Sequence, residues 1–352
     1  RRRMAGKRAL IVVDDADLLA EGEAGDLAQV VPECALLIAG QEQQIWQGAS
    51  VLLRGLPARH AVALFEQQFQ PNQVAAEDRP TGEAICEALG RIPLKIIKIA
   101  PLASQLGVSP DQVLQQVRPE EEKRDPLALA LGLIAKQLSA DQRLVLGGLA
   151  AGGGSTVGIE ALPVITGLPQ GVVTRHLPAL HKMGLVQAEG LRWGLADGLG
   201  PAVRQAWTSD EMQARAAEYY ASKVSALQHL PRDPDEGNVL SALDHYVRQE
   251  RWQQVVTMVR SMDPYLATTG RWAQWRTRLD QALQAAKKLG DRATEAWAQN
   301  QLGIIALGLG DMDLAKQLFR SALSLRRALS DRAGAVVTLW NLRVLTPPPP
   351  PP

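Results

Sequence analysis

The sequence predicts a multidomain, mostly α-helical protein that opens with a partial parallel α/β domain and ends in a superhelix of stacked helices. Three observations carry this prediction: short apolar runs alternate with helix-capable segments in the first 60 or so residues, helical patterns dominate thereafter, and a fixed repeat occurs near the end. The chain has 352 residues. This exceeds the length at which a single hydrophobic core stops growing, so several domains are expected.

The first segment reads as part of a parallel sheet. Ala9–Val13 forms a short apolar run, and Cys34–Gly40 and Ala49–Leu56 form two more, each bounded by polar or turn residues. Runs of this length, separated by segments that can form helices, are typical of strands buried on both faces. From Pro57 to Phe69 the pattern becomes helical.

Two carboxylates, Asp14 and Asp15, follow the first strand directly. An acid at this place can hold Mg²⁺ against the phosphates of a nucleotide. The alternative is that both are solvated residues of a turn. Nucleotide chemistry also needs a phosphate loop, G-x-x-x-x-G-K-[ST], before this strand. Only seven residues precede Arg8, and they contain no such loop.

The next two units are helical. Thr81–Gly107 predicts two helices broken between Gly90 and Pro93, because glycine favours a helix end and proline lacks the N–H needed to continue. A charged stretch, Arg118–Pro126, reads as a linker. After it, Ser139 is an expected helix N-cap.

Two more helical segments and a hairpin follow Ser139. The hairpin spans Leu185–Asp197 and turns near Glu189 and Gly190. The order helix, helix, helix, hairpin is the layout of a winged-helix domain.

The last part of the chain repeats with an offset of 40 residues. Matching pairs include Ala282/Ala322, Leu289/Leu329, Asp291/Asp331, Arg292/Arg332 and Leu302/Leu342, and Gln249–Trp252 is a weaker earlier copy. A fixed period of this size indicates stacked helical hairpins. Several tryptophans lie in these repeats. Most are expected in the core, while Trp252, Trp272 and Trp297 are the candidates for anchoring a bound partner.

Taken in order, these pieces resemble the NB-ARC class of STAND signalling ATPases joined to tetratricopeptide repeats (TPRs). The segment Leu10–Asp17 is similar to the Walker B strand of that family. Leu89–Ile96 resembles its G-L-P-L signature, and Gly308–Leu323 is similar to a tetratricopeptide repeat. The resemblance covers about Arg8 to Leu345.

The resemblance implies a nucleotide site. By it, Asp14 would help to hold Mg²⁺, Asp15 would polarise the attacking water, and Ile92, Pro93 and Asp197 would contact the nucleotide. The cofactor of the intact protein would be ADP or ATP with Mg²⁺. Whether this chain binds any nucleotide by itself stays open.

This chain departs from the family at the positions that would contact the phosphates of the nucleotide. The phosphate loop is absent, Gly40 stands about where the family has an arginine, and Ala196 replaces the histidine that precedes Asp197. Each lost charge-assisted hydrogen bond removes about 1.5–3 kcal/mol of binding free energy. The chain therefore looks like a STAND protein without its phosphate-binding front end. It is not expected to hydrolyse ATP by itself, and whether it is an enzyme stays open.

The sequence patterns and the family resemblance together predict five segments. They are a partial nucleotide-binding α/β domain of the P-loop type (1–78), a helical domain (79–125), a winged-helix domain (126–207), TPR-like helical repeats (208–346) and a polyproline tail (347–352).

The function expected is regulatory signal transduction, in which ADP and ATP control domain packing and the repeats sense a protein or peptide partner. One alternative is a non-enzymatic scaffold with a degenerate ATPase half. Another is a transcriptional regulator that uses the winged helix on DNA. Its third helix is only modestly basic, with Arg175, His176, His181 and Lys182. An internal latch is therefore favoured over DNA binding.

Composition sets the remaining expectations about partners. Lys and Arg (38) nearly balance Asp and Glu (37), so net charge does not indicate a nucleic-acid or membrane partner. No apolar run approaches the roughly 18 residues of a membrane span. Cys34 and Cys86 lie in apolar contexts typical of free thiols in a reducing cytoplasm. A sheet without its first strand has an unpaired edge, so a missing N-terminal segment or self-association is expected to cover it.

Overall fold

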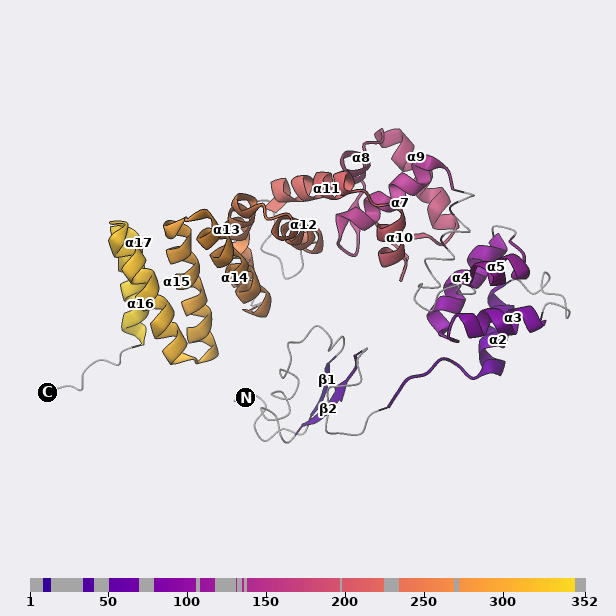
Figure 1. The fold of residues 1–352 in the computed structure, drawn as a ribbon, viewed down its shortest axis with the longest axis horizontal. Helices are drawn as coiled ribbons and strands as arrows, with labels where there is room; N and C mark the ends of the chain where they lie inside the picture. Colours follow the sequence, from indigo (N-terminus) through magenta and orange to yellow (C-terminus); the bar gives the residue numbers. More distant parts are fainter. Residues whose placement is uncertain are drawn as a thin grey trace.

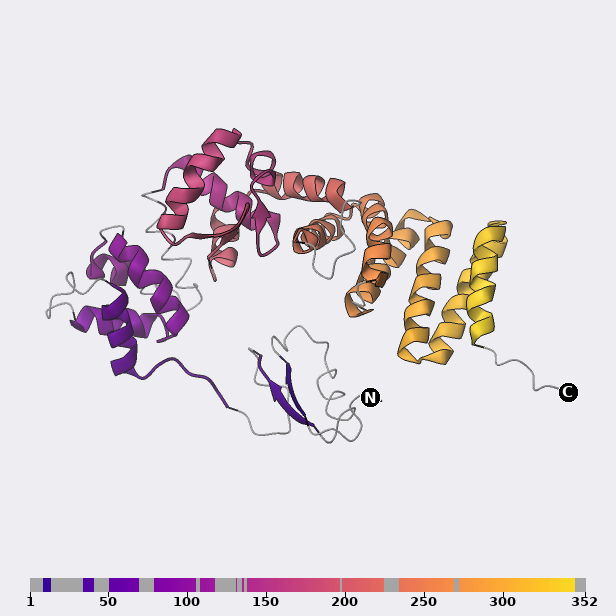
Figure 2. The same ribbon diagram turned by 180° about the vertical axis from the view of Figure 1, so that it is seen from behind.

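The computed structural model of the chain describes residues 9–13, 34–40, 51–69, 79–105, 108–117, 131, 135, 138–196, 198–224, 234–268 and 272–345. Most of these residues are helical (Figures 1 and 2). The structure thus agrees with the prediction of a mostly α-helical chain that carries small sheets. Among the described helices, none is both long and apolar enough to cross a membrane.

The first sheet has two strands, β1 (Leu10–Val13) and β2 (Ala35–Ile38). They pair in parallel, with Leu10 opposite Ala35 and Val13 opposite Ile38. Residues 51–56 form no strand and their apolar side chains are mostly exposed, so the prediction of a third strand there is wrong. An apolar run becomes a strand only when a neighbouring strand bonds to its backbone, and none of the described strands pairs with this segment.

Four helices form a separate core after this sheet. They are α2 (Ala58–Gln68), α3 (Arg79–Ala88), α4 (Pro93–Gln105) and α5 (Pro110–Val117). The break before α4 is confirmed, since Gly90 has φ +64° and Pro93 begins the helix. Residues of α2 such as Phe65 pack in this core, whereas the sequence placed them in the preceding domain. The unit thus begins before the expected boundary at residue 78.

Neither Cys34 nor Cys86 forms a disulfide bond. Cys86 is buried in the core of α2–α5, and burial together with Glu66 and Glu83 raises the pKa of its thiol to about 11. A thiol with so high a pKa stays protonated at neutral pH and is a poor nucleophile.

The next unit contains α7 (Ala140–Gly152), α8 (Ala161–Thr166), α9 (Gln170–Lys182) and α10 (Gly200–Trp207). A three-stranded antiparallel sheet in the order β3-β5-β4 joins β3 (Val157–Gly158), β4 (Val186–Glu189) and β5 (Arg192–Leu195). Ser139 caps α7 through a capping box with Gln142, and Gly190 turns the hairpin at φ +64°. The predicted order of helices and hairpin is therefore confirmed, and the name winged-helix domain stays a prediction.

The rest of the described chain is a row of helices. They are α11 (Asp210–Lys223), α12 (Glu236–Arg248), α13 (Trp252–Thr268), α14 (Trp272–Leu289), α15 (Arg292–Leu309), α16 (Met312–Ala328) and α17 (Arg332–Val344). One continuous apolar core runs from the preceding unit into α15. Helices α14 to α17 follow one another in space as in sequence (Figure 1).

The backbone itself repeats along this row. Glu250, Gly290 and Ser330 all have positive φ, at 53°, 68° and 58°, and each lies in the turn before the next helix. Asp291, Asp311 and Asp331 cap α15, α16 and α17 through side-chain hydrogen bonds. Because the positive-φ positions lie 40 residues apart, the sequence repeat, including its weak copy near Trp252, is a repeat of structure.

Candidate protein-interaction surface

A ladder of hydrogen bonds joins the helices of the repeats. Asp263 on α13 is its first node: Trp275 Nε1 of α14 donates to Asp263 Oδ1 at 2.7 Å, and Gln301 Nε2 of α15 donates to Asp263 Oδ2 at 2.7 Å. Burial raises the pKa of Asp263, and the bonds from Trp275 and Gln301 together with Arg260 oppose that rise. Three successive helices are therefore joined through one carboxyl group.

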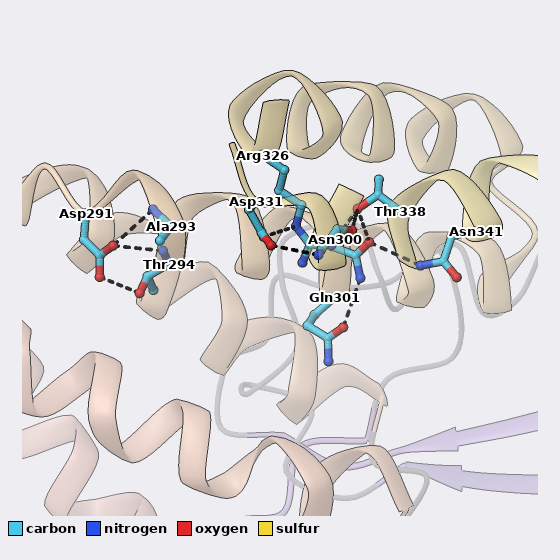
Figure 3. A network of polar contacts seen from close by, with 10 residues as sticks. Asp291, Ala293, Thr294, Asn300, Gln301, Arg326, Asp331, Thr338 and Asn341 are labelled. Atoms are coloured by element: carbon cyan, nitrogen blue, oxygen red, sulfur yellow. Dashed lines mark hydrogen bonds and ion pairs between the residues drawn. The ribbon is translucent and has the colours of Figure 1, made fainter. Parts of the chain in front are cut away.

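Asn300 on α15 is the second node (Figure 3). Its Oδ1 accepts hydrogen bonds from Thr338 Oγ1 at 3.1 Å and from Asn341 Nδ2 at 3.2 Å, both on α17. Arg326 of α16 donates to Thr338 Oγ1 at 2.8 Å and lies 3.8 Å from Asp331. Asn300 Nδ2 also donates to Gln301 Oε1 at 3.3 Å, so the two nodes form one network from α13 to α17.

The helices α13, α15 and α17 share a surface that we call the repeat face. Its members recur at offsets of 40 residues and at helical spacing within each helix: Thr257, Ser261 and Pro264; Trp297, Gln301 and Ile304; Val337, Asn341 and Val344. All of these residues are exposed or half-buried. The Arg260 guanidinium lies 4.9 Å from the centroid of the Trp297 ring, a cation–π contact between α13 and α15.

The predicted tryptophans fall in different surroundings. Trp252 and Trp297 are both half-buried against the core, and Trp297 also lies on the repeat face. Trp272 is 42% exposed, and its ring lies 5.5 Å from that of the buried Trp275. Sequence reasoning did not select Trp340, although its side chain is 67% exposed. The repeat in the sequence could have pointed to Trp340. It aligns with Asn300 at an offset of 40, so a tryptophan stands in one repeat where the preceding repeat has a polar residue.

The residues expected at the nucleotide are only partly described. Asp14, Asp15 and Asp197 lie outside the described residues. Ile92 and Pro93 are exposed at the start of α4. Leu94 Cδ2 lies 3.7 Å from the place that a β-carbon on Gly198 would occupy, so the start of α4 meets the segment beside Asp197. The described part of the chain holds no cluster of three or more potential metal ligands.

The basic residues of α9 are largely used within the unit. His181 Nδ1 lies 2.9 Å from the carbonyl oxygen of Val186, and its ring contacts Trp193 edge-on. His176 Nε2 lies 3.8 Å from Asp141. These contacts leave Arg175 and Lys182 as the exposed cations of the helix. They offer little charge to a nucleic acid.

A cavity of about 250 Å³ lies between α7, α10, α11 and α12. Small residues such as Ala150, Gly152 and Ala216 form part of its wall, and Arg204, His245 and Arg248 are its charged or basic lining residues. Burial, and then Arg248, lowers the pKa of His245. Among the described residues that line the cavity, two are arginines and none is a carboxylate.

Comparison with known proteins identifies one family. Residues 265–328 match the tetratricopeptide repeat family. They cover α14, α15 and α16, so TPRs are present in this chain. No curated protein matches the chain. These repeats generally mediate protein–protein interaction.

One solved structure is similar over most of the chain. It is the crystal structure of a signal transduction ATPase with numerous domains (STAND), with a tetratricopeptide repeat sensor, from Pyrococcus horikoshii. The identity is 12% and the TM-score 0.35, over 96% of this chain and 65% of that protein. This chain thus spans slightly less than two thirds of the length of that protein. A likeness of this degree does not establish a shared fold.

Proposed function

We propose that this chain is the regulatory and sensing part of a STAND-type signalling protein, and that its repeat face binds a protein or peptide partner. The observation that carries the proposal is the repeat face itself, on residues that include part of the matched tetratricopeptide segment. It combines an aromatic ring at Trp297, aliphatic groups at Ile304 and Val337, and amides at Gln301 and Asn341. Such a surface offers both apolar contacts and hydrogen bonds to a bound peptide.

The ladder supports this proposal energetically. Gln301 is held by Asp263, and Asn341 by Asn300, so both amides are positioned before a partner arrives. Positioned groups lose less conformational entropy on binding than mobile ones. The repeat face should therefore lose less conformational entropy on binding a ligand than a helical surface with mobile side chains.

A peptide-display selection against the full chain tests the proposal. Val337→Asp places a charge on the repeat face at an exposed position, and we expect it to weaken the selected peptides about tenfold or more. Leu309→Asp is the matched control, since Leu309 is an exposed leucine at the last residue of α15 and lies outside the repeat face. Peptides that lose affinity equally in both variants, or in neither, would argue against this face.

A second part of the proposal concerns nucleotide regulation. We propose that Pro93 and Asp197 contact ADP or ATP, that Asp14 helps to hold Mg²⁺ and that Asp15 orients water, as the family resemblance implies. The approach of Leu94 to Gly198 supports it, because it brings two of the implied segments together. The exposed apolar group at Ile92, Pro93 and Leu94 fits a nucleotide base, while the described residues add no obvious phosphate cradle.

Chromatography of what the purified chain releases on denaturation tests this second part. Stoichiometric ADP, together with thermal stabilisation by added ADP and Mg²⁺, would support nucleotide control of domain packing. We expect Leu94→Asp to abolish this stabilisation and Ile97→Asp to retain it, since both residues are similarly exposed on α4. Absence of nucleotide and of stabilisation would favour a helical-repeat scaffold with a disabled ATPase half.

A further inference from the structure

The cavity between α7, α10, α11 and α12 is lined by polar side chains that have no partner within the described chain. The side chains of Gln213 and Tyr220 on α11, and of Ser241, His245 and Arg248 on α12, form no hydrogen bond or ion pair with another described residue. Their spacing places them on one side of each helix. Helices that pack directly on each other usually present apolar residues on that side, so these two helices enclose a polar space instead.

Tyr220 is the clearest sign that the cavity is built for an occupant. Its side chain is 1% exposed, and its hydroxyl is buried without a hydrogen-bond partner. Buried polar groups in folded proteins are nearly always paired with protein or with ordered water. Because Tyr220 lines the cavity, a molecule held there can supply the missing hydrogen bond.

The charge of the cavity selects the kind of occupant. Arg204 and Arg248 are the charged side chains among its described lining residues, and both are exposed. Two carbonyl acceptors at the end of α7 already have donors: Arg204 Nη2 donates to the Ala150 carbonyl at 3.1 Å, and Asn238 Nδ2 donates to the Gly152 carbonyl at 3.0 Å. An occupant that satisfies the remaining donors must therefore bring acceptors and negative charge.

The pKa of His245 shows that cations dominate one end of the cavity. Burial lowers this pKa most and Arg248 lowers it next, while Asp210 raises it by less and Arg251 lowers it further. The cations near His245 therefore outweigh Asp210. A negative group placed beside Arg248 and His245 would be attracted to this end and would accept charge-assisted hydrogen bonds there.

We propose that this cavity binds a small organic anion, whose phosphate or carboxylate group lies between Arg204 and Arg248. The body of the ligand carries hydroxyl groups and extends toward Tyr220 and Ser241, since Ser241 lies two turns before Arg248 on α12. The volume of about 250 Å³ corresponds to about eight molecules of liquid water, so the ligand is small. No residue of the repeat face lines this cavity, and the site is therefore separate from the proposed partner surface.

Isothermal titration calorimetry of the full chain with glycerol 3-phosphate and with glycerate tests this inference. The two probes share a hydroxylated body and differ in the anionic group, and glycerol is the neutral control. We expect saturable binding of at least one anion and none of glycerol. Arg248→Gln should weaken that binding about tenfold or more. Because Arg248 is exposed and forms no ion pair with a described residue, the variant should melt at the wild-type temperature.

Arg175→Gln is the matched control, because it makes the same change of charge at an exposed position on α9 and should leave the affinity unchanged. The tighter probe identifies the anionic group. Three results would overturn the inference: no saturable binding of either anion up to about 10 mM, equal affinity for glycerol, or an equal loss of affinity in Arg175→Gln. Leu94→Asp separates this site from the proposed nucleotide contact. It should leave binding of the anion intact, and its loss there would likewise refute a separate site.

Discussion

Asn300 Oδ1 accepts hydrogen bonds from both Thr338 and Asn341, so a single amide oxygen on α15 holds two side chains of α17. Asn300 is 2% exposed and Thr338 is fully buried. Asn300→Ala removes this acceptor and leaves the buried Thr338 hydroxyl with only the Gly334 carbonyl, 3.2 Å away, to donate to. We expect it to lower the free energy of unfolding by about 1–3 kcal/mol in a urea titration. Asn341→Ala should cost less, because Asn341 is half-exposed and water can replace its bond; an equal loss in both variants would contradict this account.

Arg192 connects the hairpin strand β5 to the start of α12. Its guanidinium donates to Thr156 Oγ1 (2.9 Å), the Thr156 carbonyl (2.9 Å), Asp235 Oδ1 (2.7 Å), the Pro234 carbonyl (3.0 Å) and Asn238 Oδ1 (3.2 Å). A lysine has one nitrogen and cannot reach these acceptors together. We therefore expect Arg192→Lys to cost about 1–3 kcal/mol of stability. Thermal unfolding of the exposed control Arg175→Lys should match that of the wild type, and a similar loss there would refute the role of the Arg192 contacts.

Asp263 predicts a dependence of stability on pH. Its pKa in the folded protein is raised above 3.8, chiefly by burial. The folded state therefore binds the proton more tightly than the unfolded state, and the contribution of Asp263 to stability falls as pH rises from about 3.8 through the raised pKa. Asp263→Asn removes this titration while keeping an acceptor for Trp275. Urea unfolding between pH 4 and pH 7 should show a smaller loss of stability with rising pH in the variant, and parallel profiles would be the contrary result.

Gly303 is required by the close approach of α16 to α15. A β-carbon there would lie 2.6 Å from Cε1 of Phe319, whose ring is fully buried and cannot move aside freely. We expect Gly303→Ala to destabilise the chain by about 1–3 kcal/mol. The control on the same helix is Gly308→Ala, where the nearest atom of Trp272 would be at an ordinary 3.8 Å. That change should be neutral or stabilising by about 0.5–1 kcal/mol, since alanine favours helices. Equal melting temperatures of the two variants would disprove the packing argument.

The repeats could be predicted from sequence because their signals are local. Asp291 and Asp331 cap successive hairpins, and the leucines around them repeat at the same offset, so both the period and the helix starts are visible in the chain. The ladder could not be predicted in this way. Asn300 meets Thr338 and Asn341, which are not its repeat equivalents, and only the packing of α15 against α17 brings them together.

The first part of the chain shows where local signals fail. Residues 51–56 have the apolar composition of a strand, but strand formation depends on a partner elsewhere in the chain. Helix α2 has a clear helical pattern, yet its place in the α2–α5 core depends on tertiary contacts such as the hydrogen bond from the Leu56 N–H to the Arg91 carbonyl. The roles of Asp14, Asp15 and Asp197 stay predictions.

The ladder also gives the repeats a mechanical property. Its bonds join α13 to α14 and to α15 through Asp263, and α15 to α17 through Asn300. Hydrogen bonds are short and directional, unlike apolar contacts, which tolerate sliding. A deformation that separates α13 from α15, or α15 from α17, must therefore break at least one of these bonds. Because Asn300 and Gln301 are adjacent on α15, the contacts of α17 and those of α13 meet on one helix, so we expect a displacement of α17 to act on the bond between α15 and α13.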